Sequence, residues 1–123
     1  MDFERGSEWR RWDLHLHTAS SYDYKGEDND ALLIEKLKEN NIAAVAITDH
    51  FVIDKERIKN LRSLSPEIVF FPGVELRTDK GDTNVHVILI FSDIINIDEL
   101  VEDFNVFKRS AQNHDDNEKI YWD

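Results

Sequence analysis

Two histidines on an alternating apolar segment, Trp12-Asp13-Leu14-His15-Leu16-His17, constrain this chain more than any other feature. On a β-strand, side chains two residues apart point to the same face of the sheet. His15 and His17 are therefore expected to project together, with Asp13 on the same face. Two imidazoles on one rigid strand form a preformed pair of metal ligands. Since such a pair also occurs on strands without a metal, the neighbouring segments decide its meaning.

Three later apolar segments carry side chains of the same kinds, and these candidate ligands are Asp49, His50, Glu75 and His86. The first two follow a continuous apolar run over 42–48, which is typical of a strand covered on both faces. Glu75 follows a run over 68–71 that Pro72-Gly73 is expected to turn, and His86 lies inside the run 83–91. Because α/β folds carry their sites at the C-terminal ends of strands, we expect these residues to meet at one edge of a sheet.

Amphipathic segments separate these strands. After a polar loop, Asp30 caps the first predicted helix. Asp54 caps a second helix, with Ile53 and Ile58 placed as a hydrophobic staple. A third helix is predicted to begin at Asp98 and to lead into a frayed polar tail. Strands that alternate with helices predict an α/β fold with a mainly parallel sheet.

Composition limits the class of protein. A chain of 123 residues that is 41% hydrophobic suits one domain with a packed core. With no cysteine in the sequence, any metal must be bound through nitrogen and oxygen. A formal net charge of -11 argues against a broad basic face for nucleic acid, although bound cations can reverse the local field. No apolar run suits a membrane span or a secretory signal, so a cytoplasmic location is expected.

Taken together, these segments resemble the first motifs of the PHP superfamily (polymerase and histidinol phosphatase). The stretch from Asp13 to Asp23 resembles the first motif, and Ala46-Ile47-Thr48-Asp49-His50 resembles the second. Pro72-Gly73-Val74-Glu75-Leu76, followed by His86, resembles the third. The likeness spans residues 9–91 with the motifs in the correct order, which makes it specific for the superfamily.

The resemblance implies a distorted (β/α)7 barrel that holds two or three divalent metal ions at its C-terminal mouth. The metal ligands that it implies in this chain are His15, His17, Asp23, His50, Glu75 and His86. Of these, His15 and His17 would hold one metal, and Glu75 would bridge two. Asp49 is expected to orient His50 or to support the ligands from behind, and Glu75 and Asp49 are the expected catalytic residues. Nitrogen and oxygen ligands suit Zn, Mn or Fe, and the sequence does not choose among them.

The family hydrolyses phosphate esters, so the resemblance also implies an activity. Residues 6–12 are similar to the start of PHP domains fused to AAA- or SMC-like ATPases. The leading prediction is therefore a metal-dependent phosphodiesterase or nuclease module of a larger ATPase-linked protein, with a phosphate ester or nucleic acid as its substrate. Two alternatives stay open: a truncated, non-catalytic module for metal binding or assembly, and a small-molecule phosphatase of the histidinol-phosphate type.

The chain departs from the family pattern after His86, because no later segment matches the distal histidine and Asp-x-His motifs of the family. Residues 1–123 are expected to form one partial PHP domain, the N-terminal half of the barrel, with its motifs in 9–91 and its polar tail from near residue 110. A half barrel leaves sheet edges and an apolar face open. The rest of the barrel or a second copy is expected to cover them, and this chain alone is expected to have little or no activity.

Each candidate residue also has a purely structural interpretation. These interpretations are a core position for His86, a turn for His50 and a strand-end surface for Glu75. Trp9 and Trp12 could stack on bases, but their place at the start of the first strand favours packing against the floor of the barrel. Lys108 and Arg109 suit a phosphate contact, and equally the C-terminus of a helix, where cations are favoured.

Overall fold

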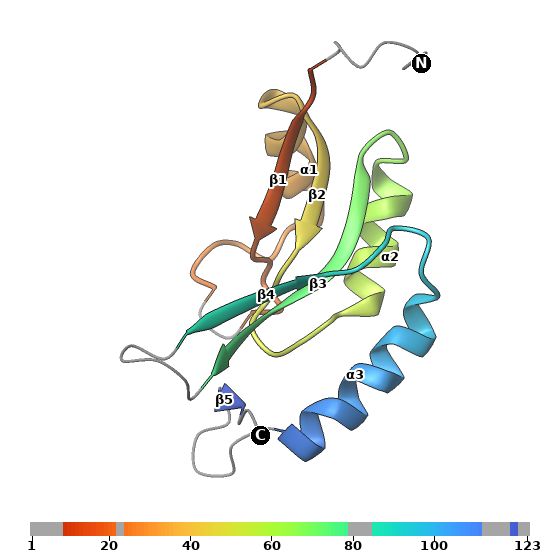
Figure 1. The fold of residues 1–123 in the computed structure, drawn as a ribbon. Helices are drawn as coiled ribbons and strands as arrows, with labels where there is room; N and C mark the ends of the chain where they lie inside the picture. The colour runs from red at the N-terminus through yellow and green to blue at the C-terminus, as the bar shows by residue number, and fades with distance from the viewer. Residues whose placement is uncertain (1–8, 22–23, 79–84, 112–118, 121–123) are drawn as a thin grey trace.

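A computed structural model describes residues 9–21, 24–78, 85–111 and 119–120 of the chain. The elements, in order, are β1 (Arg11–Leu16), α1 (Asp30–Glu39), β2 (Ile42–Ile47), α2 (Lys55–Leu64), β3 (Val69–Thr78), β4 (His86–Ile90), α3 (Ile97–Ala111) and β5 (Lys119–Ile120). The sheet curls into part of a barrel, with α1 and α2 behind the strands and α3 across the lower part of the view (Figure 1). The predicted α/β half barrel with mostly parallel strands is confirmed.

The strands pair in the order β1-β2-β3-β4. β1 pairs with β2, and β2 with β3, in parallel, whereas β4 is antiparallel to β3. β4 differs because only residues 79–85 connect it to β3, and a parallel crossover needs a dozen or more residues. The short β5 pairs in parallel with the end of β3, where the sequence predicted only a frayed tail.

All three helices pack on one face of the sheet. The core that they share with the strands contains Ile34, Leu37, Val45, Ile47, Ile58, Leu61, Phe70, Val74, Leu76, Leu100 and Phe104. On β3 the core residues Phe70, Val74 and Leu76 face the helices. Because side chains alternate along a strand, Phe71 and Glu75 lie on the opposite face of β3. The fold therefore places Glu75 on the face of the sheet that the helices leave open.

Side chains of Asn and Asp cap the N-termini of the helices. Asn29, not the predicted Asp30, caps α1 and accepts a hydrogen bond of 3.0 Å from a backbone N–H of the first turn. Asp54 caps α2 as predicted. Asn96, rather than Asp98, accepts the first backbone N–H groups of α3. Asn and Asp cap almost equally well, so the sequence does not choose between neighbours. In the described part of the chain, no helix has the length and apolar character needed to cross a membrane.

β3 continues as one strand through Pro72-Gly73, where the sequence predicted a turn. The carbonyl of Pro72 accepts a hydrogen bond of 2.8 Å from the residue that follows β4. At Gly73, a Cβ atom would lie 2.7 Å from the carbonyl oxygen of Leu89 and 3.1 Å from that of Ile47. The glycine therefore lets the backbones of β2, β3 and β4 approach closely, and the strand reaches Glu75 without a break.

Gly73→Ala is expected to lower the free energy of unfolding by about 1–3 kcal/mol, because the new methyl group meets two backbone oxygens that have little freedom to move. Gly26→Ala is the matched control, since a Cβ atom there meets only the end of the flexible Tyr24 side chain. Urea unfolding followed by circular dichroism measures both variants. Equal stability of the two would contradict the close approach of the strands at Gly73.

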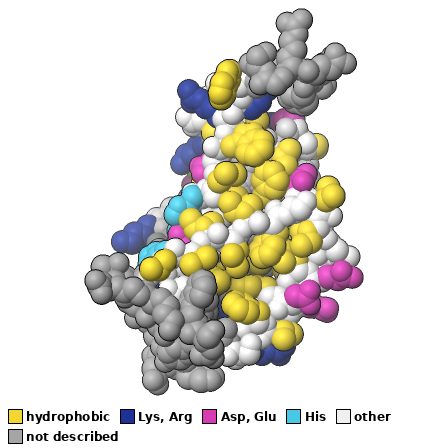
Figure 2. All heavy atoms as spheres, in the orientation of Figure 1, with side chains coloured by type: hydrophobic (Ala, Val, Ile, Leu, Met, Phe, Trp, Pro, Cys, Tyr) yellow, Lys and Arg dark blue, Asp and Glu magenta, His cyan; other side chains and the backbone are white. Residues whose placement is uncertain are grey.

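The face of the sheet away from the helices is largely apolar and exposed. Figure 2 shows hydrophobic side chains gathered over the strands on this face. Exposed apolar residues of β1, β3 and β4 include Trp12, Val69, Ile88 and Ile90. The ring of Trp12 packs near that of Phe71, with centroids 5.9 Å apart. Trp9 is 94% exposed, so its predicted packing against a barrel floor is not found among the described residues.

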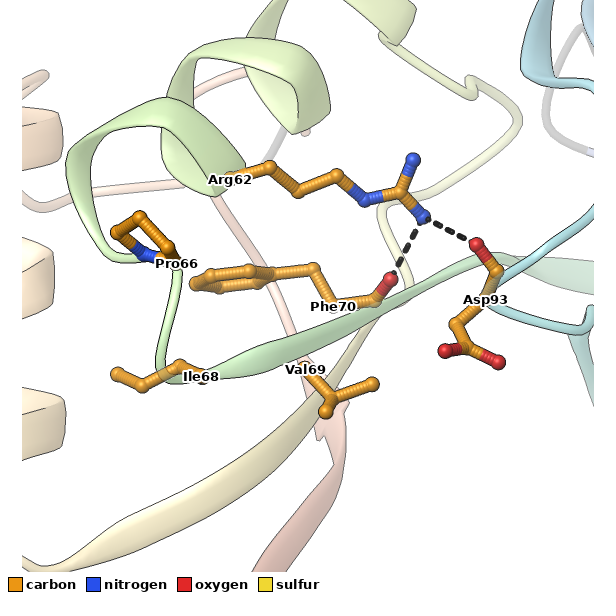
Figure 3. A pocket seen from close by; sticks show the side chains of 6 residues that line it. All are labelled: Arg62, Pro66, Ile68, Val69, Phe70 and Asp93. Carbon is orange, nitrogen blue, oxygen red and sulfur yellow. Dashed lines mark hydrogen bonds between the residues drawn. The ribbon is translucent and has the colours of Figure 1, made fainter. Parts of the chain in front are cut away.

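A small cavity of about 210 Å³ lies beside the start of β3 (Figure 3). Its lining residues are Arg62, Pro66, Ile68, Val69, Phe70 and Asp93. The guanidinium of Arg62 donates to the carbonyl oxygens of Phe70, at 2.8 Å, and Asp93, at 3.2 Å, while the Asp93 carboxylate points away. The cavity is smaller than typical ligand pockets of roughly 300–1,000 Å³. Through its two hydrogen bonds, Arg62 of α2 connects this helix to β3 and to the segment before α3.

Candidate metal centre

The buried carboxylate of Glu75, 4% exposed, is the centre of a cluster of histidines. Its Oε1 atom lies 2.6 Å from Nε2 of His15. Its Oε2 atom lies 2.9 Å from Nε2 of His50 and 3.8 Å from Nε2 of His17. The structure thus brings together four of the six predicted metal ligands, from the ends of β1 and β2 and from within the neighbouring strand β3.

The end of β1, which carries His15 and His17, is irregular. Asp13 and Leu16 are three residues apart, yet they are in register with two residues of β2 that are only two apart. This extra residue acts as a bulge and interrupts the alternation of side chains. Asp13 was expected on the histidine face, but its register partner belongs to the core and its carboxylate accepts a hydrogen bond of 3.1 Å from the backbone of His15.

Nε2 of His17 is the atom that points most directly to a cation. It is buried and has no hydrogen-bond partner among the described residues. A buried polar atom without a partner costs about 1–3 kcal/mol. The ligand atoms of His15, His17 and Glu75 all lie within 4.8 Å of one another. A divalent cation would use the unpaired nitrogen and the negative charge of Glu75, so these residues fit a metal with nitrogen and oxygen ligands.

Asp49 holds the loop after β1. Its buried carboxylate accepts hydrogen bonds from the backbone N–H and, at 2.7 Å, from the hydroxyl of Thr18. Burial raises the pKa of the Asp49 carboxyl, and the hydrogen bonds from Thr18 oppose this rise. Because Thr18 directly follows His17, these bonds fix the end of β1 beside a candidate ligand. Asp49 was predicted to orient His50 or to support the ligands from behind, and its contacts with Thr18 agree with the second of these. Its catalytic role stays a prediction.

The same loop is anchored by side chains that the sequence pattern did not reveal. Ser21 accepts a hydrogen bond of 3.1 Å from the backbone N–H of His50. Ser20 accepts one of 2.8 Å from Nε of Arg57 on α2. Arg57 also pairs with Asp28 at 2.9 Å, and this hydrogen bond is the largest cause that raises the pKa of the guanidinium above its ordinary value. The serines lie within the first motif, which was the signal available in the sequence.

Phe51, directly after His50, has a left-handed backbone with φ of 56°. This conformation costs a bulky residue roughly 1–2 kcal/mol. The N–H of Phe51 donates to the carbonyl of Glu75 at 3.2 Å, and the N–H of Glu75 donates to the carbonyl of Asp49 at 3.0 Å. These bonds set His50 opposite Glu75. Glycine is the usual residue at such a position, so the sequence did not predict a left-handed backbone at Phe51.

The family model for the PHP domain matches residues 13–120 of this chain. The chain belongs to the PHP family. The resemblance found from the His-x-His, Asp-His, Glu75 and His86 motifs is therefore confirmed. No curated protein is similar enough in sequence to count as a match to this PHP domain.

A solved structure of an amidohydrolase from Chromobacterium violaceum, described with bound sulfate and no metal, is similar to this PHP domain. The TM-score is 0.56 and the sequence identity is 20%. The likeness covers 81% of this chain and 34% of the amidohydrolase, so the chain spans about a third of that protein's length. At this identity the likeness concerns the fold, and it agrees with a partial barrel.

PHP domains form a metal-dependent, hydrolase-type family, and the described residues of this PHP domain offer the cluster of His15, His17 and Glu75 for a divalent metal. The two other predicted ligands are not brought into this cluster. His86 begins β4 opposite Arg77, is exposed, and does not belong to the group of clustered ligand atoms. Asp23 lies outside the described residues. A ligand role for each stays a prediction.

Proposed function

We propose that this PHP domain is the metal-binding part of a phosphoesterase that hydrolyses phosphodiesters. The observation that carries the proposal is the buried carboxylate of Glu75 in contact with His15 and His50, beside the unpartnered Nε2 of His17. Imidazoles that converge on one carboxylate at strand ends are suited to a divalent cation. Mn, Zn and Fe are the ions proposed, with two or three in a complete site.

The residues of this chain would bind and orient the ion. Glu75 supplies the negative charge, and His15 and His17 supply nitrogen ligands. The bonds from Thr18 to Asp49 keep the end of β1 in place, as supporting contacts do around metal ligands in general. A bound divalent cation would polarise a phosphoryl oxygen and offset the charge of the phosphate.

The choice of a phosphodiester rests on the sequence. Residues 6–12 are similar to PHP domains that are linked to ATPases, and this supports a nuclease or phosphodiesterase that acts in a larger cytoplasmic protein. The net charge of -11 argues against a broad basic surface for nucleic acid. Recognition of phosphate would therefore depend on the bound cations, which reverse the local field.

A second candidate function is a non-catalytic module for metal binding or assembly. The observation that favours it is the open apolar face, where Trp12, Ile88 and Ile90 are exposed on strands rather than on loops. Exposed apolar patches of this kind mark surfaces that another protein segment covers.

Hydrolysis by the protein at its full encoded length decides between these functions. The protein is freed of metal, reloaded with Mn²⁺, Zn²⁺ or Fe²⁺, and offered bis(p-nitrophenyl) phosphate, p-nitrophenyl phosphate and single-stranded DNA. We expect metal-dependent cleavage of the diesters, faster than that of the monoester and abolished by EDTA. Preference for the monoester would favour the small-molecule phosphatase, metal binding without hydrolysis would favour the module, and failure to bind any of the ions would overturn both metal-based functions.

A further inference from the structure

We propose that Lys108 on α3 is a positioning residue for His50, and that the docking of α3 thereby sets the metal affinity of the centre. The inference rests on the proposed metal centre. Nζ of Lys108 donates a hydrogen bond of 2.7 Å to the carbonyl oxygen of Phe51. Phe51 directly follows His50, so a helix distant in sequence holds the backbone beside a residue that contacts Glu75.

Three contacts hold the left-handed backbone of Phe51 in place. Its N–H bonds to Glu75 on β3, its ring is 5% exposed in the core, and its carbonyl accepts the ammonium of Lys108. An unfavourable φ persists only where the surroundings hold it. Of these restraints, β3 and the core supply two, and α3 supplies the third. Removal of Lys108 would leave the Phe51 carbonyl to relax, and the adjoining His50 would lose its fixed position against Glu75.

The side chain of Lys108 is less exposed than is usual for a lysine at the end of a helix. Its side chain is partly buried, and burial lowers the pKa of its ammonium group. No carboxylate among the described residues forms an ion pair with it, so the Phe51 carbonyl is the polar group that receives the charge. The neighbouring Arg109, in contrast, is exposed. Lys108 lies in the last turn of α3, as the helix-terminus interpretation predicted, and its ammonium group contacts the Phe51 carbonyl in addition. A phosphate contact of Lys108 stays a prediction.

The position of α3 is itself well defined, because Ile97, Leu100 and Phe104 are buried in the common core. In Figure 1, α3 runs across the lower part of the half barrel, and Lys55 and Lys59 of α2 both pair with Asp98 in its first turn. Lys108 stands one turn beyond Phe104 on the same side of α3, since residues four apart share a face. A shift of α3 would therefore be transmitted to the carbonyl of Phe51 through the hydrogen bond from Lys108.

Three variants of the full-length protein test the proposal, namely Lys108→Met, Lys108→Arg and the control Arg109→Met. Co²⁺ affinity is measured by titration calorimetry, and hydrogen exchange of the Phe51 amide is measured in the metal-free protein. For Lys108→Met we expect Co²⁺ affinity to fall by about 10- to 100-fold, the range known for groups that support metal ligands. Exchange at Phe51 should quicken. Lys108→Arg keeps a hydrogen-bond donor and should restore part of the Co²⁺ affinity and part of the protection of the Phe51 amide. Arg109→Met should match the wild type in both measurements.

Wild-type Co²⁺ affinity in Lys108→Met would overturn the role of Lys108 and leave the metal centre standing. Failure of the wild-type protein to bind Co²⁺, Mn²⁺ or Zn²⁺ would overturn the proposed function itself. In that case exchange at Phe51 still decides whether Lys108 holds the turn, and an unchanged rate in Lys108→Met would count against it. If Lys108→Met does not fold, Lys108→Gln, which retains a shorter donor, serves for the same two measurements.

Discussion

Glu75→Gln should abolish hydrolysis by the full-length protein and weaken divalent-metal binding by more than about 100-fold, beyond the range known for outer supporting groups. The amide has nearly the same shape as the carboxylate but carries no charge. It also replaces one acceptor oxygen with an NH₂ group that would face an imidazole nitrogen. Since Glu75 is in contact with both His15 and His50, its charge is the only negative one within the histidine cluster of the described residues.

Titration calorimetry with Mn²⁺ and a phosphodiesterase assay measure the two effects of Glu75→Gln. Glu35→Gln makes the same chemical change at an exposed position on α1 and should leave both unchanged. Circular dichroism establishes that each variant is folded. A threefold change in metal affinity is worth less than 1 kcal/mol. If the metal affinity of Glu75→Gln stays within about threefold of the wild-type affinity, the carboxylate is not a ligand.

His15→Ala combined with His17→Ala should remove most of the bound metal, because the pair supplies two of the three clustered ligands. The loss should exceed that of either single variant. Element analysis of the protein after gentle purification gives the occupancy, and unchanged metal content in the double variant would contradict the predicted site.

Folding stability in the absence of metal distinguishes a loss of metal ligands from a general loss of structure in the histidine variants. Nε2 of His17 is buried without a hydrogen-bond partner among the described residues, so its removal relieves a cost of about 1–3 kcal/mol and offsets the packing lost with the imidazole. His17→Ala should therefore have a metal-free stability close to that of the wild type while its metal affinity falls. A large loss of metal-free stability would show that His17 acts in packing.

The order of strands and helices and the edge that bears the site could be predicted from the sequence, because they depend on local periodicity and on the motifs. The run over 42–48 reads as a buried strand, and Asp54 with Ile53 and Ile58 marks the start of α2 correctly. His15 and His17 were expected to meet Glu75 at the ends of strands. The structure brings the three side chains together, although Glu75 lies inside β3 and not at its end.

The remaining features depend on contacts between segments that are distant in sequence. The bulge that separates Asp13 from the histidines arises from the pairing of β1 with β2. The uninterrupted course of β3 through Gly73 depends on the close approach of the backbones of β2 and β4. Phe51 adopts a left-handed turn because β3, the core and α3 hold it together. None of these partners can be read from the residues adjacent to the feature.

The spacing of the clustered residues along the chain has a consequence for biosynthesis. Glu75 is the last of the four residues that meet at the centre, and Lys108 is made 33 residues later. At about 5–20 residues per second, the ribosome needs roughly 2–7 s to add that segment. During this interval every clustered ligand has been synthesised, while the helix that secures the turn after His50 has not. Metal capture by the nascent chain would thus begin at a looser centre than the finished protein contains, and the completion of α3 would close it.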